Sequence, residues 1–227
     1  MPIYKKRIKS GKITEVYQYY SARKTGKNYL PRTENKNTTP EEKQVINMRE
    51  ARLKLTRIIN CNFDKNDSFI RLSYIKKVSD AEAIQDYRNF IRRLKYYIRA
   101  NNLPELKYVS VTERGKGKVH HHIIMNFTDI NKIKNIWDNG GVYSVNLWSE
   151  DYEGLANYIT KETIRNEHGK RWSQSRNLEK PIIEVQELKK EPKNGPEIPK
   201  GYTLIESKCY VTAAGHKTWY IKAVKNE

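Results

Sequence analysis

Three consecutive histidines open an apolar, β-prone stretch just after a glycine-containing turn. On a β-strand alternate side chains share a face, so His120 and His122 point the same way and His121 points to the other face. Two imidazoles at i and i+2 on a rigid strand can hold one divalent ion, because neutral imidazole suits Mn, Fe, Zn and related metals. An apolar run over residues 108–112 ends on Glu113, whose carboxylate can return across the hairpin as an oxygen ligand. A hairpin that simply carries exposed histidines is the alternative interpretation.

A second group of reactive side chains lies in residues 151–165, which have the apolar spacing of a helix. Tyr158 and Lys161 are at i and i+3, hence neighbours on one helix face. A phenol ordinarily has a pKa of about 10, so a tyrosine nucleophile needs help to ionise at neutral pH. Glu162, close to one turn beyond the tyrosine, could activate water, although a salt-bridging helix glutamate is the simpler explanation. A buried structural tyrosine is the alternative for Tyr158.

The order of these motifs resembles that of the HUH endonucleases, and their rolling-circle replication initiators match best. A strand bearing His-x-His is followed, about forty residues later, by a helix bearing Tyr-x-x-Lys. Further matches in the same order are Phe69–Tyr74 at the place of the family's first motif, Glu113 before the histidines, and Trp172–Leu178 after the helix. The resemblance covers roughly residues 66–185. The sequence departs from the family at His121, where a bulky hydrophobe is usual.

This resemblance implies a metal-dependent, site-specific nickase and strand transferase that acts on single-stranded DNA and initiates rolling-circle replication of a plasmid or phage. Its divalent metal, Mn²⁺ or Mg²⁺, would be held by His120, His122 and Glu113. Tyr158 would become linked to a 5′-phosphate and leave a free 3′-hydroxyl. Lys161 would stabilise the phenolate or the charge that develops on the phosphate.

Some replication initiators carry two catalytic tyrosines one helical turn apart, but Gly154 and Glu162 occupy those places here, so a single-tyrosine enzyme is expected.

Two classes of alternative function stay open at this point. A relaxase usually has an N-terminal tyrosine, whereas Tyr158 follows the histidines; a single-strand transposase shares the same chemistry. A non-catalytic nucleic-acid-binding module would instead show stacking aromatic residues on an open sheet face and no metal dependence.

The net charge of +18 and the pI near 9.7 favour a polyanionic partner. Lysine and arginine that neutralise phosphates release counterions, which makes binding strong and salt-dependent. Residues 1–60 carry 15 Lys or Arg against 5 Glu, consistent either with an arm that grips origin duplex DNA or with a solvated surface. Arg114, Lys116 and Lys118 flank the hairpin, where they are placed to meet phosphates. Such contacts position a strand without reading its bases, so the sequence does not reveal the origin.

Several features indicate a cytoplasmic protein that works with host factors. Two cysteines, Cys61 and Cys209, fit a reducing compartment, and no apolar stretch approaches the length of a membrane span or a signal-peptide core. The chain also lacks a phosphate-binding Gly-Lys-Thr motif. Unwinding would therefore come from a host helicase or from supercoiling, and synthesis from a host polymerase.

The pattern of apolar residues predicts an α+β fold in which helices pack on an antiparallel sheet. We expect three segments: a basic N-terminal extension (1–62, hairpin plus helix), an HUH nicking domain (63–190), and a Pro/Gly-rich loop with C-terminal strands (191–227). The expected strands are 69–74, 107–112, 119–127 and 141–147, with a hairpin within 3–20 and two strands within 202–223. The expected helices are 40–59, 80–100, 130–137 and 151–165.

Overall fold

The computed structural model describes residues 1–21, 39–115, 118–161, 171–190, 194–212 and 215–226. Packing divides the chain into two compact units, residues 1–57 with 180–227 and residues 58–179. Each unit contains one five-stranded antiparallel sheet. The described residues also form four helices, and this mixture of sheets and helices confirms the predicted α+β class.

The unit of residues 58–179 is built on what we call the central sheet, with strand order β6-β3-β5-β4-β7. The described residues of this unit contain three complete helices besides the end of α1 (Pro40–Asn62), and the sequence pattern predicted each of the three. The strands are β3 (Ser68–Ser73), β4 (Tyr108–Gly115), β5 (Lys118–Met125), β6 (Val142–Asn146) and β7 (Ser173–Gln174). The helices are α2 (Asp80–Ala100), α3 (Ile130–Ile136) and α4 (Glu153–Ile159).

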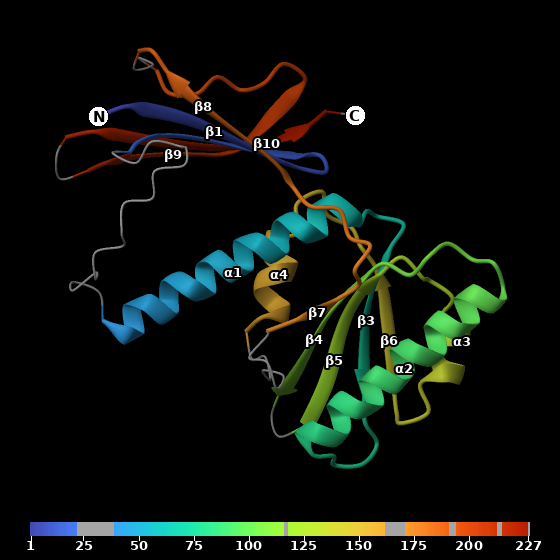
Figure 1. Cartoon of the computed structure of the whole chain (residues 1–227). Coiled ribbons are helices and arrows are strands. Elements are labelled where there is room, and N and C mark those ends of the chain that lie inside the picture. Colours follow the sequence, from blue (N-terminus) through green and yellow to red (C-terminus); the bar gives the residue numbers. More distant parts are fainter. Residues whose placement is uncertain (22–38, 116–117, 162–170, 191–193, 213–214, 227) are drawn as a thin grey trace. The chain divides into compact units, whose positions relative to one another are not determined.

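Helix α2 covers one face of the central sheet because it carries a continuous apolar stripe. A capping box starts it: the Glu82 N–H donates to the Ser79 hydroxyl, and the Ser79 N–H donates to the Glu82 carboxylate. The apolar side chains of α2 join those of α3 and of the sheet in one core, in which Trp137 is almost fully buried. Helix α4 lies on the opposite side of the sheet from α2 (Figure 1). One face of the sheet is therefore core, and the other is left for α4.

The unit of residues 1–57 and 180–227 is built on the terminal sheet, with strand order β8-β1-β2-β10-β9. Strand β2 pairs with β10 and β1 pairs with β8, so segments from the two ends of the chain share one sheet. The predicted hairpin and the two predicted C-terminal strands are present, whereas β8 was not predicted. The elements are β1 (Ile3–Ser10), β2 (Ile13–Tyr20), α1 (Pro40–Asn62), β8 (Ile182–Leu188), β9 (Tyr202–Val211) and β10 (Lys217–Lys225).

The division into three segments at residues 62 and 190 stays a prediction, because strand pairing does not show which segments fold independently. Pairing does show that removing residues 1–60 would take away β1 and β2, on which β8 and β10 are paired. None of the helices within the described part of the chain is both long and apolar enough to cross a membrane.

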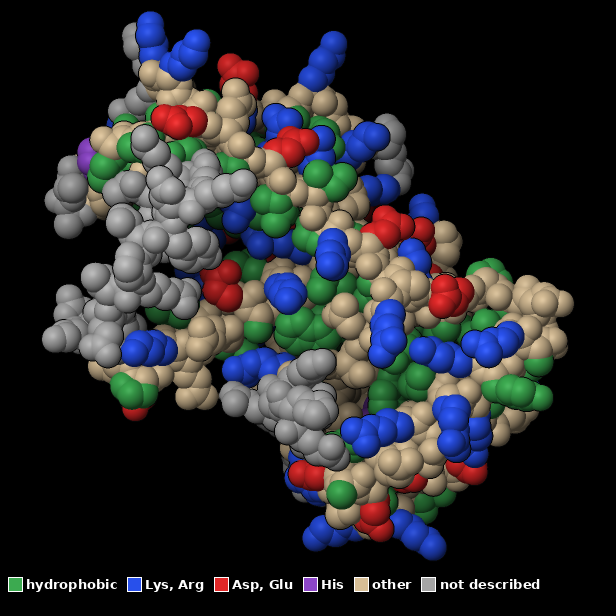
Figure 2. All heavy atoms as spheres, in the orientation of Figure 1, with side chains coloured by type: hydrophobic (Ala, Val, Ile, Leu, Met, Phe, Trp, Pro, Cys, Tyr) green, Lys and Arg blue, Asp and Glu red, His purple; other side chains and the backbone are tan. Residues whose placement is uncertain are grey.

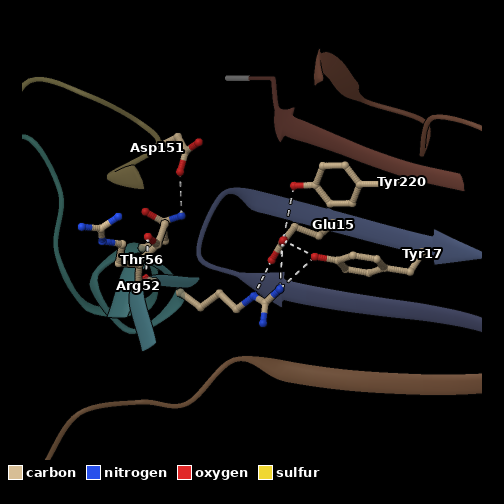
Figure 3. A network of polar contacts seen from close by, with 8 residues as sticks. Glu15, Tyr17, Arg52, Thr56, Asp151 and Tyr220 are labelled. Atoms are coloured by element: carbon tan, nitrogen blue, oxygen red, sulfur yellow. Dashed lines mark hydrogen bonds and ion pairs between the residues drawn. The ribbon is translucent and has the colours of Figure 1, made fainter. Parts of the chain in front are cut away.

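A buried polar network joins helix α1 to the terminal sheet through Glu15 (Figure 3). Arg57 of α1 donates to both oxygens of the Glu15 carboxylate, with Nε–Oε2 and Nη2–Oε1 distances of 2.5 and 3.0 Å. The hydroxyls of Tyr17 and Tyr220 donate to the same carboxylate, at 2.9 and 3.4 Å. Burial, followed by the charge of Glu15, raises the pKa of Tyr17, which keeps this phenol protonated as a donor. Every partner of the buried carboxylate is thus a hydrogen-bond donor.

We expect Arg57→Met to lower the free energy of unfolding by about 3–5 kcal/mol, because it leaves the Glu15 charge buried without its cation. Urea unfolding followed by circular dichroism measures the loss. The double variant Glu15→Leu/Arg57→Met is the control, since removing both charges together should cost much less than either removal alone. Single and double variants of equal stability would show that the ion pair does not hold α1 to this sheet.

Candidate active site on the central sheet

The β4–β5 hairpin brings three of the predicted site residues onto one face of the central sheet. Glu113 is the cross-strand partner of His120, and His122 is the partner of Val111, two residues along β4. Directly paired residues on antiparallel strands share a face, and so do residues two positions apart. Glu113, His120 and His122 therefore lie together on the side of the sheet on which α4 lies, called here the α4 face.

His122 is the most enclosed of these side chains, with 1% of its surface exposed. Its Nε2 lies 2.7 Å from Oε1 of Glu113, a hydrogen-bond distance. Its ring stacks on Phe69 of β3, with ring centroids 5.5 Å apart. The second ring nitrogen, Nδ1, is buried and has no hydrogen-bond partner among the described residues. A buried nitrogen without a partner is unusual, because buried polar atoms are nearly always hydrogen-bonded.

His120 is less enclosed than His122 and sits at the end of the same face. Partial burial lowers the pKa of His120, and the positive charge of Arg71 and the neighbouring His122 lower it further. The ring is therefore neutral at physiological pH, the form in which imidazole binds metals. Within the part of the chain that the structure describes, no three His, Cys, Asp or Glu side chains converge closely enough to form a metal site.

His121 points to the core face, as strand alternation predicts, and it is fully buried there. Hydroxyl groups meet both of its ring nitrogens: Tyr74 lies 3.0 Å from Nε2 and Thr112 lies 2.9 Å from Nδ1. Its ring also stacks on Tyr87, with centroids 5.0 Å apart. Burial lowers the pKa of His121 to about 3, so the ring is uncharged. This explains the departure from the family pattern: a neutral, fully satisfied histidine replaces the usual core hydrophobe.

We expect His121→Ala to destabilise the protein by about 2–4 kcal/mol, because it leaves a core cavity and removes the partner of two half-buried hydroxyls. His121→Phe restores volume and should recover part of that loss. Thermal or urea unfolding of both variants measures the difference. Full stability in His121→Ala would mean that the ring is not a core element.

Tyr158 projects from α4 beside the enclosed histidine. Ala156 and Ile159 are buried and anchor the helix, whereas 55% of the Tyr158 surface is exposed. The Tyr158 ring meets His122 edge-on, with centroids 5.6 Å apart, and lies 6.3 Å from the ring of Phe69. The phenol is thus accessible and adjacent to the imidazole.

Helix α4 is shorter than the sequence pattern predicts, since it begins at Glu153 and ends at Ile159. Thr160 follows it, and its hydroxyl donates to the Ala156 carbonyl at 2.7 Å. Such a bond competes with continuation of the helix. Lys161 is exposed and lies in the next turn, where its N–H donates to the Tyr158 carbonyl at 3.4 Å. Lys161 therefore stays one turn from the phenol, although it is outside the helix. Glu162 falls outside the described residues.

The start of α4 is held by Asn60, from the last turns of α1. The Asn60 amide donates to Asp151 at 3.2 Å, and its carbonyl oxygen accepts from the Tyr152 N–H at 3.0 Å. The dashed line to Asp151 in Figure 3 marks the first of these bonds. Tyr152 itself is only 3% exposed, so this neighbouring phenol is not presented to solvent as Tyr158 is. Asn60 positions the helix that carries Tyr158, but within the described part of the chain no hydrogen bond joins it to Glu113, His120 or His122.

The three predicted phosphate contacts differ in their surroundings. The Arg114 guanidinium forms an ion pair with Asp80 and donates to the Val78 carbonyl at 3.3 Å. Lys118 is exposed at the start of β5. Lys116 falls outside the described residues. Figure 2 shows Lys and Arg side chains spread over the viewed surface of both units rather than collected in one patch. The net positive charge therefore supports binding to a polyanion, but the spread of these side chains does not locate the binding site.

Comparison with known families supports a role in replication. Residues 67–165 match the family model described as Replication-associated protein ORF2/G2P. The match suggests a replication initiator. It spans β3, the β4–β5 hairpin and α4, which carry the residues brought together above. A match to a replication-associated family implies interaction with DNA. No curated protein and no solved structure matches the chain.

Sequence reasoning placed Phe69 and Arg71 in the strand of the first motif but gave no individual role to them or to Tyr143, and all three shape this site. Phe69 stacks on His122 and lies edge-on to Tyr158, so it borders both of these side chains. Arg71 is the cross-strand partner of His122, and Tyr143 is the partner of Arg71 on the far side of β3. Alternation within the strands predicts the face on which each side chain lies. It could not predict that β3 would be inserted between β5 and β6, which is what makes these residues neighbours.

Proposed function

We propose that the chain nicks and rejoins single-stranded DNA at a replication origin, with Tyr158 as the nucleophile. The observation that carries the proposal is the accessible phenol of Tyr158 next to His122, whose Nε2 contacts Glu113. The match of residues 67–165 to a replication-associated family supports the same substrate. Rolling-circle initiation at a specific origin is the biological process we assign to this reaction.

The proposed step conserves the energy of the phosphodiester bond. The Tyr158 oxygen loses its proton and attacks the scissile phosphorus, the bond from phosphorus to the 3′-oxygen breaks, and the 3′-oxygen leaves and takes up a proton. The tyrosine then carries the 5′-phosphate of the downstream strand. Attack by a 3′-hydroxyl on this phosphotyrosine reverses the step and rejoins DNA without ATP. Lys161, exposed one turn from the phenol, would stabilise the negative charge that develops.

The α4 face carries two imidazoles and a carboxylate, the donor types that bind divalent cations, and a bound ion would have to draw the three side chains closer together. His122 has a buried ring nitrogen with no partner and a second nitrogen against a carboxylate, and the lowered pKa of His120 favours its neutral form. We propose that His120, His122 and Glu113 hold Mn²⁺ or Mg²⁺. When bound, such an ion would act as a Lewis acid on the scissile phosphate, an effect worth several kcal/mol. The chain's own part is to carry these three donors on the sheet face on which the phenol lies.

A nicking assay on labelled single-stranded oligonucleotides, with and without added Mn²⁺ or Mg²⁺, tests the proposal. Cleavage that leaves a protein-linked 5′-phosphate supports it. A relaxase or transposase would give the same adduct. Cleavage that requires a replication-origin sequence from plasmid or phage DNA would distinguish a replication initiator from these enzymes. Single-strand binding with no cleavage under any metal would favour the non-catalytic module instead.

We further propose that the unit of residues 1–57 and 180–227 supplies affinity for origin duplex DNA. The unit carries 24 Lys and Arg against 11 Glu, a net charge of +13 out of the total of +18. Since deleting residues 1–60 would remove β1 and β2 from its sheet, substitution of exposed lysines is the better test. A host helicase and polymerase would act after the nick.

We expect the variant Lys189→Gln/Lys200→Gln/Lys217→Gln to bind duplex DNA with a weaker dependence on salt. The slope of log K against log salt should fall by about 0.9 for each of these lysines that contacts a phosphate. Fluorescence anisotropy at several salt concentrations measures the slope. The matched control removes three exposed lysines from the other unit. It is Lys76→Gln/Lys77→Gln/Lys134→Gln. Equal slopes in the two triple variants would contradict a special role for the terminal sheet.

A further inference from the structure

Arg71 and Tyr143 form an exposed pair on the α4 face that the proposed reaction does not use. They are cross-strand partners on β3 and β6, and the Arg71 guanidinium carbon lies 5.6 Å from the centre of the Tyr143 ring. This is the distance of a cation–π contact. The Tyr143 ring is 54% exposed, so much of its surface is still open to another partner.

The pair lies in line with the reactive residues. Arg71 is also the partner of His122, so His122, Arg71 and Tyr143 lie side by side on three adjacent strands. Neighbouring strands are about 4.8 Å apart, which puts Tyr143 about 10 Å across the sheet from His122. Tyr158 contacts His122 from above the same face. An extended single strand whose phosphate is at Tyr158 would reach Tyr143 within a few nucleotides.

The place of Tyr143 is fixed by the turn that precedes β6. The Ser73 N–H donates to the Gly141 carbonyl at 2.9 Å, which starts the pairing of β6 with β3. A Cβ atom on Gly140 would lie 2.2 Å from the Ser73 carbonyl oxygen, so only glycine permits this close approach. The ring is therefore presented by a constrained strand rather than by a loose loop.

An arginine and a tyrosine on a sheet surface are often no more than a solvated pair that contributes little to stability. Two features separate this pair from that case: it directly adjoins the imidazole beside the candidate nucleophile, and its aromatic ring is half-exposed on the face where the substrate must lie. Proteins that bind single-stranded nucleic acids combine an aromatic ring that stacks on a base with a cationic side chain that contacts the phosphate backbone.

We propose that Arg71 and Tyr143 form a nucleobase-binding subsite for the single strand, next to the phosphate that Tyr158 attacks. The Tyr143 ring stacks on one base, and the Arg71 guanidinium contacts an adjoining phosphate while it packs on the ring. Because every base has a π-face, the subsite takes any base and positions the strand without specifying its sequence. The inference rests on the proposed function for its substrate, but stacking does not require cleavage.

Binding of a fluorescein-labelled oligothymidylate of about ten nucleotides tests the subsite, in a Tyr158→Phe background that cannot form the adduct. We expect Tyr143→Leu to weaken binding by about 5- to 150-fold, the range measured for loss of one stacked base. Tyr143→Phe keeps the ring and should bind within about twofold of its parent. Leucine preserves apolar bulk on the strand, so the loss cannot be assigned to unfolding of β6. Tyr96→Leu, at an exposed tyrosine on α2, is the matched control.

Undiminished affinity in Tyr143→Leu, or equal losses in Tyr143→Leu and Tyr96→Leu, would overturn the subsite. The proposed function has separate outcomes, measured with the native Tyr158. If the wild-type chain forms the 5′-phosphotyrosine adduct while Tyr143→Leu binds normally, the nicking reaction stands and the subsite fails. If Tyr143→Leu binds weakly and the wild-type chain never forms the adduct, the subsite stands and the nicking reaction fails.

Discussion

The variant Tyr158→Phe should form no covalent adduct with single-stranded DNA, whereas its affinity for the same strand should stay within about twofold of that of the wild-type chain. Phenylalanine keeps the ring that contacts His122 and Phe69, so the packing of α4 is preserved. It removes only the oxygen that would attack the phosphorus. Loss of adduct should exceed a thousandfold, since removal of a covalent nucleophile abolishes the step it performs.

The position of the label on the oligonucleotide shows which of the two fragments becomes attached to the protein. An oligonucleotide labelled at its 3′ end should shift to the mass of protein plus fragment, whereas a 5′ label should remain on a free fragment that ends in a 3′-hydroxyl. Tyr152→Phe is the matched control, because Tyr152 is the neighbouring phenol and is buried. An adduct that peptide mapping places on Tyr152, or one that persists undiminished in Tyr158→Phe, would refute the assignment.

Local periodicity predicted several of the features that surround Tyr158. The apolar stripe and capping box of α2, and the alternation that divides His121 from His120 and His122, depend only on neighbours within one element. Such patterns are visible because side-chain direction repeats every 3.6 residues in a helix and every two in a strand. Local sequence was therefore enough to place the imidazoles on opposite faces and to place the tyrosine after them.

Local sequence patterns could not predict which residues far apart in the chain become neighbours. Strand β8 went unpredicted; it buries almost none of its side chains, and it is held by its pairing along the edge of β1. Asn60 reaches the start of α4 across ninety residues of sequence, and nothing in its own surroundings indicates that partner. The same holds for Arg71 and Tyr143, which become neighbours of His122 only through the strand order.

Removing one donor from the α4 face should be nearly as damaging as removing the nucleophile. We expect His122→Ala, His120→Ala and Glu113→Gln each to lower the rate of nicking by about 100-fold or more, since a Lewis acid worth several kcal/mol would be lost or weakened. Single-strand binding should persist, because phosphate contacts elsewhere supply most of the affinity. Chelator should stop cleavage by the wild-type chain, and added Mn²⁺ should restore it.

Activity alone would not separate a metal ligand from a residue that merely shapes the site, so direct Mn²⁺ binding is the second measurement. Titration followed by electron paramagnetic resonance should show weaker binding in each of these three variants. His121→Phe is the matched control: it changes the middle histidine of the same strand but acts on the core face, so it should bind Mn²⁺ and nick like the wild type. Undiminished nicking in excess chelator would remove the cation from the reaction. Loss of Mn²⁺ binding in His121→Phe, with binding kept in His120→Ala, would instead reverse the faces assigned to the three histidines.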